Sequence, residues 1–205
     1  MKKAAWLVLL PALAQAAVVG EDYTVLAKPI PQLQPNKVEV LEFFGYFCVH
    51  CYHLDPILLK HSRSFAPDTY LRTEHVVWQP DMLGLAKVAA AVNRSGLKYQ
   101  ANPAVFKAVY EQKLDLADAD EFRKWATAQK TFDGKRLWVA YQQPQTATVA
   151  KNMQKLTETY QISGTPTVIV GGKYQIKFDK GFPQGMKTMD ELIAKVRAER
   201  GLKTH

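Results

Sequence analysis

The chain contains 205 residues, 47% of them hydrophobic, and carries a formal net charge of +8 at pH 7. A chain of this length buries roughly 70% of the surface that its unfolded form exposes, so it needs no disulfide scaffold to fold. Its lysines and arginines are scattered and form no basic block, which argues against nucleic-acid binding. The composition therefore indicates a globular protein with a mildly basic, solvated surface.

The first residues have the pattern of a secretory signal peptide. A Met-Lys-Lys start precedes the apolar run 4–13, which is broken only by Pro11, and residues 14–16 are Ala-Gln-Ala, the small-x-small pattern of a cleavage site. The apolar run is too short to remain as a transmembrane helix. We therefore expect residues 1–16 to be a signal peptide and the mature chain to begin near Ala17, soluble outside the cytoplasm.

A strand and a helix are predicted on either side of the two cysteines. Residues 38–44 are rich in β-branched and aromatic side chains and predict a strand, which Gly45 ends. After Cys51 the apolar residues have helical spacing, with Pro56 inside the run, where we expect a kink or a break. Backbone N–H groups at a helix start stabilise a thiolate, so Cys48 is predicted to be the exposed nucleophile and Cys51 the shielded thiol.

The spacing of the cysteines favours a reactive pair over a structural one. Cys48 and Cys51 are the only cysteines and are separated by Val49 and His50. A disulfide between them closes a ring that stabilises a fold by only about 2 kcal/mol, against about 4.7 for a loop of about 100 residues. The pattern therefore indicates redox chemistry, in which His50 could place a donor beside the Cys48 sulfur.

The middle of the chain is predicted to be helical. No convincing strand appears from residue 81 to residue 143. Ser95-Gly96 marks a break, and Pro103 is well placed at a helix start. The expected helices are 83–93, 103–113, 118–130, 134–142 and 146–160.

The last part of the chain predicts a hairpin and a closing helix. Residues 162–170 read as a turn followed by a strand with Pro166 at its head, and Gly171-Gly172 fits a two-residue turn into the strand 173–178. Thr188 with Glu191 has the signature of a capping box at a helix start, and Gly201 stands where a C-terminal cap belongs.

Several of these stretches together resemble the DsbA family of periplasmic thiol:disulfide oxidases. The matching residues are 23–26 with 28–29, 40–44, 47–52, 164–167 and 172–175. The resemblance implies an α/β protein with a thioredoxin-like fold interrupted by an inserted all-helical domain. The expected division is 17–80 and 146–205 for the two parts of the thioredoxin-like domain and 81–145 for the helical insertion.

The resemblance also implies a function. A periplasmic monomer without a cofactor would donate its Cys48–Cys51 disulfide to reduced, unfolded exported proteins, and a quinone-linked membrane enzyme like DsbB would reoxidise it. A reductase or isomerase of the same fold remains an alternative, because Val49 stands where the best-known oxidases have proline. The second alternative is a peptide-binding module without redox turnover.

For the site residues, the resemblance implies a cis peptide bond before Pro166, which would lie against the cysteines. The backbone of Thr165 would pair with an extended substrate segment, and Val49 is expected to contact substrate as well. Glu42 would manage the proton on Cys51 through water. The alternative for Glu42 is a solvent-facing carboxylate at a strand edge.

One acidic position is expected to lack its partner. Asp55 matches an acidic position of the family, but Thr73 stands where the family's lysine is expected. This departure puts a buried ion pair at the site in doubt.

Several histidines and aromatic residues allow further predictions about metal binding, the core and the surface. With the cysteines, His53, His61 and His75 could bind zinc or copper, although the Pro166 strand favours a redox site and no metal is expected. Trp78, Trp125 and Trp138 are expected in the core. Tyr46 and Phe47 are candidates for an apolar rim that receives unfolded substrates.

Overall fold

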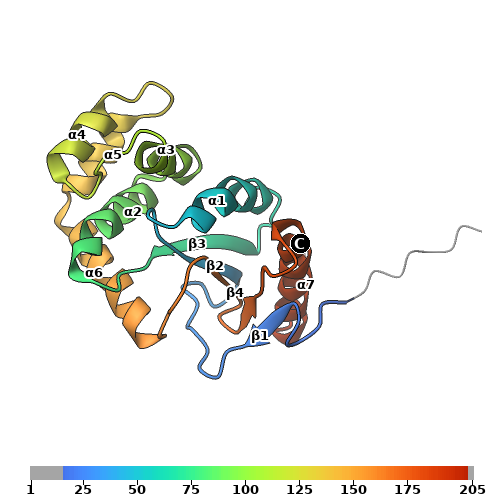
Figure 1. Cartoon of the computed structure of the whole chain (residues 1–205). Coiled ribbons are helices and arrows are strands. Elements are labelled where there is room, and N and C mark those ends of the chain that lie inside the picture. Colours follow the sequence, from blue (N-terminus) through green and yellow to red (C-terminus); the bar gives the residue numbers. More distant parts are fainter. Residues whose placement is uncertain (1–15, 203–205) are drawn as a thin grey trace, which may run out of the picture.

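A mixed five-stranded sheet forms the centre of the molecule (Figure 1). The computed structural model describes residues 16–202, so the predicted signal peptide lies almost entirely outside the described residues. The strand order is β1-β5-β4-β2-β3, in which β2 runs parallel to β3 and every other pair is antiparallel. The strands are β1 Tyr23–Val25, β2 Val38–Phe44, β3 Thr69–His75, β4 Thr167–Val170 and β5 Tyr174–Ile176.

Helices cover both faces of the sheet and extend beyond one end of it. Helices α2 to α5 lie together at one end of the sheet, and the chain returns to the sheet through α6 (Figure 1). No helix among residues 16–202 is both long enough and apolar enough to cross a membrane. The helices are α1 Val49–Ser62, η1 Pro80–Met82, α2 Leu83–Ser95, α3 Lys98–Tyr110, α4 Ala119–Thr127, α5 Gly134–Gln142, α6 Pro144–Thr159 and α7 Phe182–Glu199.

Side chains along β2 point alternately to the two faces of the sheet, and both faces are buried. Val38 and Val40 pack with α1 and α7 on one face, while Leu41 and Phe43 pack on the other face with side chains from α6. A third cluster fills the helical region, and Cys51 belongs to it. The reactive pair therefore lies where the sheet meets the inserted helices.

Glycines end elements where the sequence predicted turns. Gly171 and Gly172 have φ angles of 64° and 70°, which side chains with a Cβ rarely adopt, and they connect β4 to β5. Gly96 at the end of α2 and Gly201 after α7 also have positive φ. The predicted breaks at these positions are confirmed.

The break allowed for at Pro56 and the helix start predicted at Pro103 are both absent. Helix α1 is not broken, because Pro56 lies inside a helix that continues to Ser62. Pro103 does not begin a helix but lies inside α3, which starts at Lys98 directly after the turn at Gly96. A proline inside a helix removes one backbone hydrogen bond, and burial of the apolar side chains around it offsets that loss.

The predicted capping box is also wrong. Helix α7 begins at Phe182, with Gly181 as its N-cap and a proline in its first turn. Thr188 is consequently buried inside the helix, and its hydroxyl has no hydrogen-bond partner among the described residues. The glycine–proline start therefore overrides the Thr–Glu signature six residues further on.

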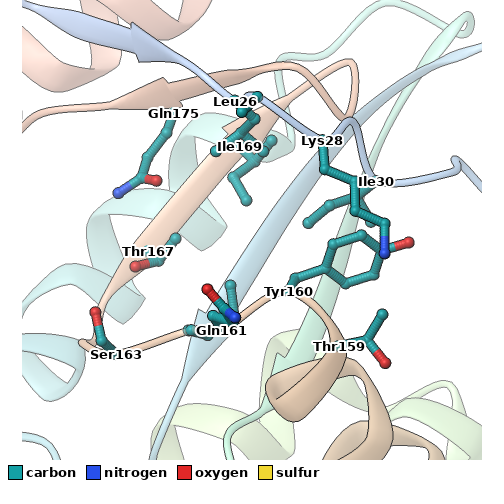
Figure 2. Close-up of a pocket in the computed structure, with 12 residues that line it drawn as sticks. Leu26, Lys28, Ile30, Thr159, Tyr160, Gln161, Ser163, Thr167, Ile169 and Gln175 are labelled. Atoms are coloured by element: carbon teal, nitrogen blue, oxygen red, sulfur yellow. The ribbon is translucent and has the colours of Figure 1, made fainter.

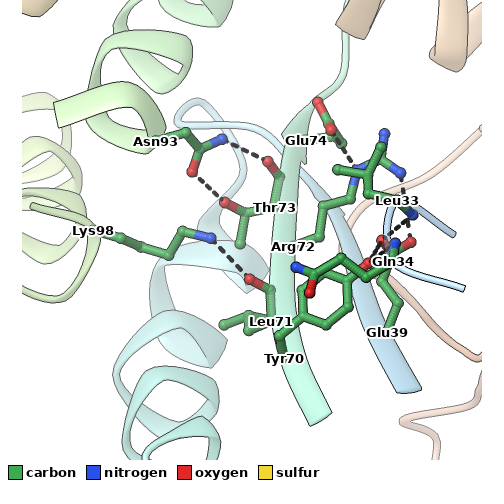
Figure 3. A network of polar contacts seen from close by, with 10 residues as sticks. All are labelled: Leu33, Gln34, Glu39, Tyr70, Leu71, Arg72, Thr73, Glu74, Asn93 and Lys98. Carbon is green, nitrogen blue, oxygen red and sulfur yellow. Dashed lines mark hydrogen bonds and ion pairs between the residues drawn. The ribbon is translucent and has the colours of Figure 1, made fainter. Parts of the chain in front are cut away.

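Strand β3 is the edge of the sheet, and helical side chains cover its outer carbonyl groups. Asn93 of α2 donates to the Thr73 carbonyl at 2.8 Å, and the Lys98 ammonium of α3 donates to the Leu71 carbonyl at 3.1 Å (Figure 3). The Thr73 hydroxyl also bonds to Asn93 at 3.0 Å. These contacts satisfy backbone groups that an edge strand would otherwise expose.

Candidate active site

The two cysteines lie at the start of α1, as the sequence predicted. Cys48 is the N-cap residue, and its sulfur accepts a hydrogen bond from the Cys51 N–H at 3.3 Å. Cys48 is partly exposed, whereas Cys51 is fully buried one turn further on, and both are free thiols in this structure. The geometry thus separates an accessible sulfur from a shielded one.

Hydrogen bonds at the helix start favour the charged form of Cys48. The Cys51 thiol beneath it, together with the backbone N–H groups of Cys51 and His50, lowers the pKa of Cys48 to about 5, although partial burial opposes this shift. The positive end of the helix dipole acts in the same direction. These contacts therefore favour the thiolate form of Cys48 at neutral pH.

Cys51 is affected in the opposite direction. Its hydrogen bond to Cys48, its burial and the nearby Glu42 carboxylate all raise the pKa of the Cys51 thiol. In the reduced pair the proton consequently stays on Cys51. The arrangement favours one thiolate and one thiol.

The loop before β4 faces the cysteines across the site. The Thr165–Pro166 peptide bond is cis, and the Cys48 thiol lies 3.4 Å from the Thr165 carbonyl oxygen. A groove of about 450 Å³ continues from Pro166 and His50 toward Phe178 and Phe182. The loop therefore lies against the Cys48 sulfur and borders this groove.

The residues between the cysteines lie on the surface. Val49 is 45% exposed, and His50 is exposed at the mouth of the groove beside Pro166. Among the described residues the His50 imidazole makes no hydrogen bond to Cys48, and the contribution of His50 to the thiolate comes from its backbone N–H.

A second hollow of about 440 Å³ lies behind the same loop (Figure 2). Ser163 and Thr167, on either side of Pro166, line it, and the Lys28 ammonium lies 5.4 Å from the centre of the Tyr160 ring at its wall. No cysteine lines this hollow.

Glu42 lies beneath the cysteines and not at a solvent-facing edge. Strand β2 is interior to the sheet, between β4 and β3, and Glu42 is 2% exposed. Burial and then the neighbouring Asp55 raise the pKa of Glu42 to about 8. The alternative of an exposed strand-edge carboxylate is therefore wrong, and the carboxyl is close enough to Cys51 to affect its titration.

Asp55 belongs to a buried polar group that the sequence pattern did not reveal. Asn102 of α3 donates to one Asp55 carboxylate oxygen at 2.6 Å and accepts from the Tyr46 hydroxyl at 2.5 Å. The other carboxylate oxygen is buried without a partner among the described residues, and burial raises the pKa of Asp55 to about 7. Tyr46 is fully buried, so its expected place on an exposed rim is wrong.

Trp78 is also not where the sequence analysis expected it. Its side chain is 42% exposed, its ring lies 5.7 Å from that of Phe47, and its indole N–H donates to the Ile162 carbonyl at 2.5 Å. Trp78 therefore bridges the segment before Cys48 and the loop that carries Thr165. Trp125 is buried and Trp138 packs against the helical core, as expected.

The histidines named as metal candidates lie apart from one another. His53 is exposed on α1, and His61 bonds to Asp190 of α7 at 2.8 Å. His75 is fully buried and accepts the Tyr46 backbone N–H at 3.1 Å, and burial lowers its pKa to about 4. Within residues 16–202 no three metal-binding side chains come together.

Comparisons with known proteins agree with this geometry. The thioredoxin family profile matches residues 35–195. The thiol:disulfide interchange protein DsbA of Pseudomonas aeruginosa is 31% identical over 188 residues, covering 87% of this chain and 85% of that protein. The DsbA of Burkholderia cepacia is 30% identical over 188 residues, covering 90% of this chain and 88% of that protein.

Solved structures extend the comparison to the fold. Reduced DsbA1 from Neisseria meningitidis superposes with a TM-score of 0.88 at 53% identity, covering 92% of this chain and 99% of that one. The oxidoreductase NmDsbA3 from the same organism gives 0.80 at 66% identity, covering 89% and 98%. The predicted thioredoxin fold with a helical insertion is confirmed, and the chain belongs to the DsbA family of thiol:disulfide oxidoreductases.

Proposed function

We propose that this protein is an oxidase that donates the Cys48–Cys51 disulfide to reduced, unfolded exported proteins in the periplasm. The observation that carries the proposal is the opposite shift of the two thiols, with Cys48 favoured as a thiolate and Cys51 held as a thiol. Stabilising the thiolate stabilises the reduced pair, which makes the disulfide a stronger oxidant.

The cycle begins when a substrate thiolate attacks the Cys48 sulfur. The Cys48–Cys51 bond breaks, Cys51 leaves as a thiolate and takes a proton from Glu42, and a mixed disulfide joins Cys48 to the substrate. The substrate segment lies against the Thr165 backbone and the Pro166 groove, as in strand addition. A second substrate thiolate then attacks the substrate sulfur, and Cys48 leaves as a thiolate.

Turnover needs an electron acceptor for the reduced pair. We propose a quinone-linked membrane enzyme like DsbB, which would accept two electrons and restore the disulfide. The protein would act as a monomer, because one chain supplies both cysteines and the substrate loop. The predicted signal peptide, residues 1–16, supports export to the periplasm.

The test is the equilibrium of residues 17–205 with glutathione redox buffers, followed through the Cys48–Cys51 bond. We expect a potential of about −120 mV, the value known for DsbA enzymes. A value of about −200 mV or lower would indicate a reductase or isomerase instead. Failure to form the bond would leave a peptide-binding module. A Cys51→Ala variant is the control, since it retains Cys48 but cannot form the bond.

A further inference from the structure

A side chain of the helical insertion is hydrogen-bonded to the segment that leads into Cys48. Tyr110 is the last residue of α3, and its hydroxyl donates to the carbonyl of Phe47, the residue directly before Cys48. Among the described residues this carbonyl accepts no backbone N–H, so the Tyr110 hydroxyl supplies its partner. The insertion therefore holds a peptide group that is covalently joined to the nucleophile.

The peptide group between Phe47 and Cys48 is held at both ends. Its carbonyl accepts the Tyr110 hydroxyl, and its N–H donates to the Gly45 carbonyl at 2.9 Å. The segment is also closely packed, because a Cβ at Gly45 would lie 2.6 Å from the Phe47 ring. Since a peptide group is planar, these two bonds together fix its orientation and the direction in which the Cys48 backbone continues.

The Tyr110 ring is itself held in place by the start of α1. It stacks on the Tyr52 ring, with 5.1 Å between the ring centres and 10° between the planes. The Tyr52 hydroxyl donates to Glu111 at 2.7 Å, and the Tyr52 N–H donates to the Cys48 carbonyl at 3.0 Å. The hydroxyl that reaches Phe47 is consequently carried by a ring with a defined position.

Tyr110 keeps its proton over the whole range in which Cys48 titrates. Burial, and then the charges of Cys48 and Cys51, raise the pKa of Tyr110 above its ordinary value. The charged group recorded against its ring is Lys113, whose ammonium lies 5.9 Å from the ring centre. The hydroxyl therefore remains a hydrogen-bond donor while the thiol loses its proton.

The contacts of the Cys48 sulfur depend on where the backbone places it. The sulfur accepts the Cys51 N–H at 3.3 Å and lies 3.4 Å from the Thr165 carbonyl oxygen. Both distances are long for hydrogen bonds, and such bonds weaken steeply as their geometry worsens. A rotation of the peptide group before Cys48 would consequently move the sulfur away from the donor that stabilises its charge.

We propose that Tyr110 is a positioning residue, whose hydroxyl fixes the Phe47–Cys48 peptide group and thereby keeps the Cys48 sulfur at the start of α1, within reach of the Cys51 N–H. This inference rests on the proposed function, because the oxidising strength of the disulfide depends on how well that site stabilises a thiolate. It gives the helical insertion a part in the redox chemistry that acts through the backbone.

The experiment compares Tyr110→Phe with the native protein, because phenylalanine keeps the ring against Tyr52 and removes only the hydroxyl. Thiolate absorbance is titrated against pH for both reduced proteins. Losing one hydrogen bond should weaken the stabilisation of the thiolate about fivefold, which raises the midpoint by about 0.7 pH unit.

Equilibrium with glutathione gives an independent measurement of the same effect. The reduced protein and oxidised glutathione exchange to give the protein disulfide and two molecules of reduced glutathione. The same factor of about five should make the potential of Tyr110→Phe about 20 mV more negative than the native one. Should Tyr110→Phe fold poorly, Tyr110→Met is measured in its place, with the same expected shifts.

Tyr99→Phe is the matched control. Tyr99 also lies on α3 and its hydroxyl also contacts α1, but at Ser62, the other end of that helix, at 3.1 Å. Its midpoint and potential should equal the native values, although its resistance to urea should fall as that of Tyr110→Phe does. Equal shifts in both variants would show that α3 acts only through general packing and would overturn the proposal.

Two further outcomes are decisive. A Tyr110→Phe protein that is less stable in urea but has the native midpoint and potential would also overturn the proposal, because the hydroxyl would then be only structural. A native protein that never forms the Cys48–Cys51 bond would instead contradict the proposed function.

Discussion

The rim of the site, formed by Cys48 and Thr165, differs in kind from the chamber beneath it, which holds Cys51, Glu42 and Asp55. At the rim, backbone N–H groups and a carbonyl surround a partly exposed sulfur. In the chamber, ionisable side chains from several elements lie close together out of solvent. Hydrogen bonds at the rim thus lower the pKa of Cys48, whereas the hydrogen bond to Cys48, burial and the nearby Glu42 raise the pKa of Cys51.

The largest effect on disulfide exchange is expected from replacing each of the two cysteines in turn. Cys48→Ser removes the rim nucleophile and should abolish oxidation of reduced proteins. Cys51→Ser should retain the thiolate and accumulate mixed disulfides, because nothing inside the protein resolves them. Mass spectrometry of both variants after incubation with oxidised glutathione checks this, because attack of the Cys48 thiolate on that disulfide forms the mixed disulfide and releases one glutathione thiolate. Mixed disulfides on Cys48→Ser would contradict the assignment of roles.

Glu42→Gln tests how far the buried Glu42 carboxyl destabilises the folded protein at high pH. The raised pKa means that native Glu42 contributes most stability below pH 4.5 and loses it as pH rises through about 8. At about 1.4 kcal/mol per unit, the variant should be more stable than the native protein by at most about 5 kcal/mol at alkaline pH. Urea unfolding at pH 4 and pH 9 measures the difference. Equal stabilities at both pH values would exclude a buried, charged Glu42.

His75 is a buried neutral imidazole that accepts the Tyr46 N–H in the segment before Cys48. Its lowered pKa contributes stability above pH 6.5 that is lost as pH falls through about 4. The loss is about 3 kcal/mol, and Glu42 titrates with the opposite sign over part of this range. His75→Gln should therefore be less stable at pH 7 but lose less than the native protein on acidification. Urea unfolding of His75→Gln and of the native protein from pH 7 down to about pH 4 tests this prediction. The surface variant His53→Gln is the control.

The smallest effect concerns the rim alone. Trp78→Phe keeps an aromatic ring beside Phe47 but removes the donor to the Ile162 carbonyl. Losing one hydrogen bond of about 1 kcal/mol should loosen the Thr165 loop and raise KM for a dithiol peptide about fivefold, with kcat little changed. Trp138→Phe, in the helical core, is the control. An unchanged KM would show that the bridge does not hold the loop.

The same comparison explains what the sequence could reveal. The rim was predictable because a strand, a glycine, the two cysteines and Pro166 leave local patterns, and β2 and the Gly171-Gly172 turn were predicted from the same kind of signal. The chamber was only partly predictable, through Glu42 and Asp55. Asn102 carries no local signal, because only the packing of α3 against α1 brings it to Asp55. The capping box predicted at Thr188 is absent because helix α7 already begins at Phe182, after the Gly181 N-cap. A local signature is therefore overridden when a helix start lies a few residues before it.

The most direct test of the account is a pH titration of the thiolate absorbance of the reduced protein. We predict a midpoint at about pH 5 with the amplitude of one thiolate, absent in Cys48→Ser and retained in Cys51→Ser. A midpoint above pH 8, close to an ordinary cysteine, would contradict the claim that the rim holds a thiolate over a protonated partner.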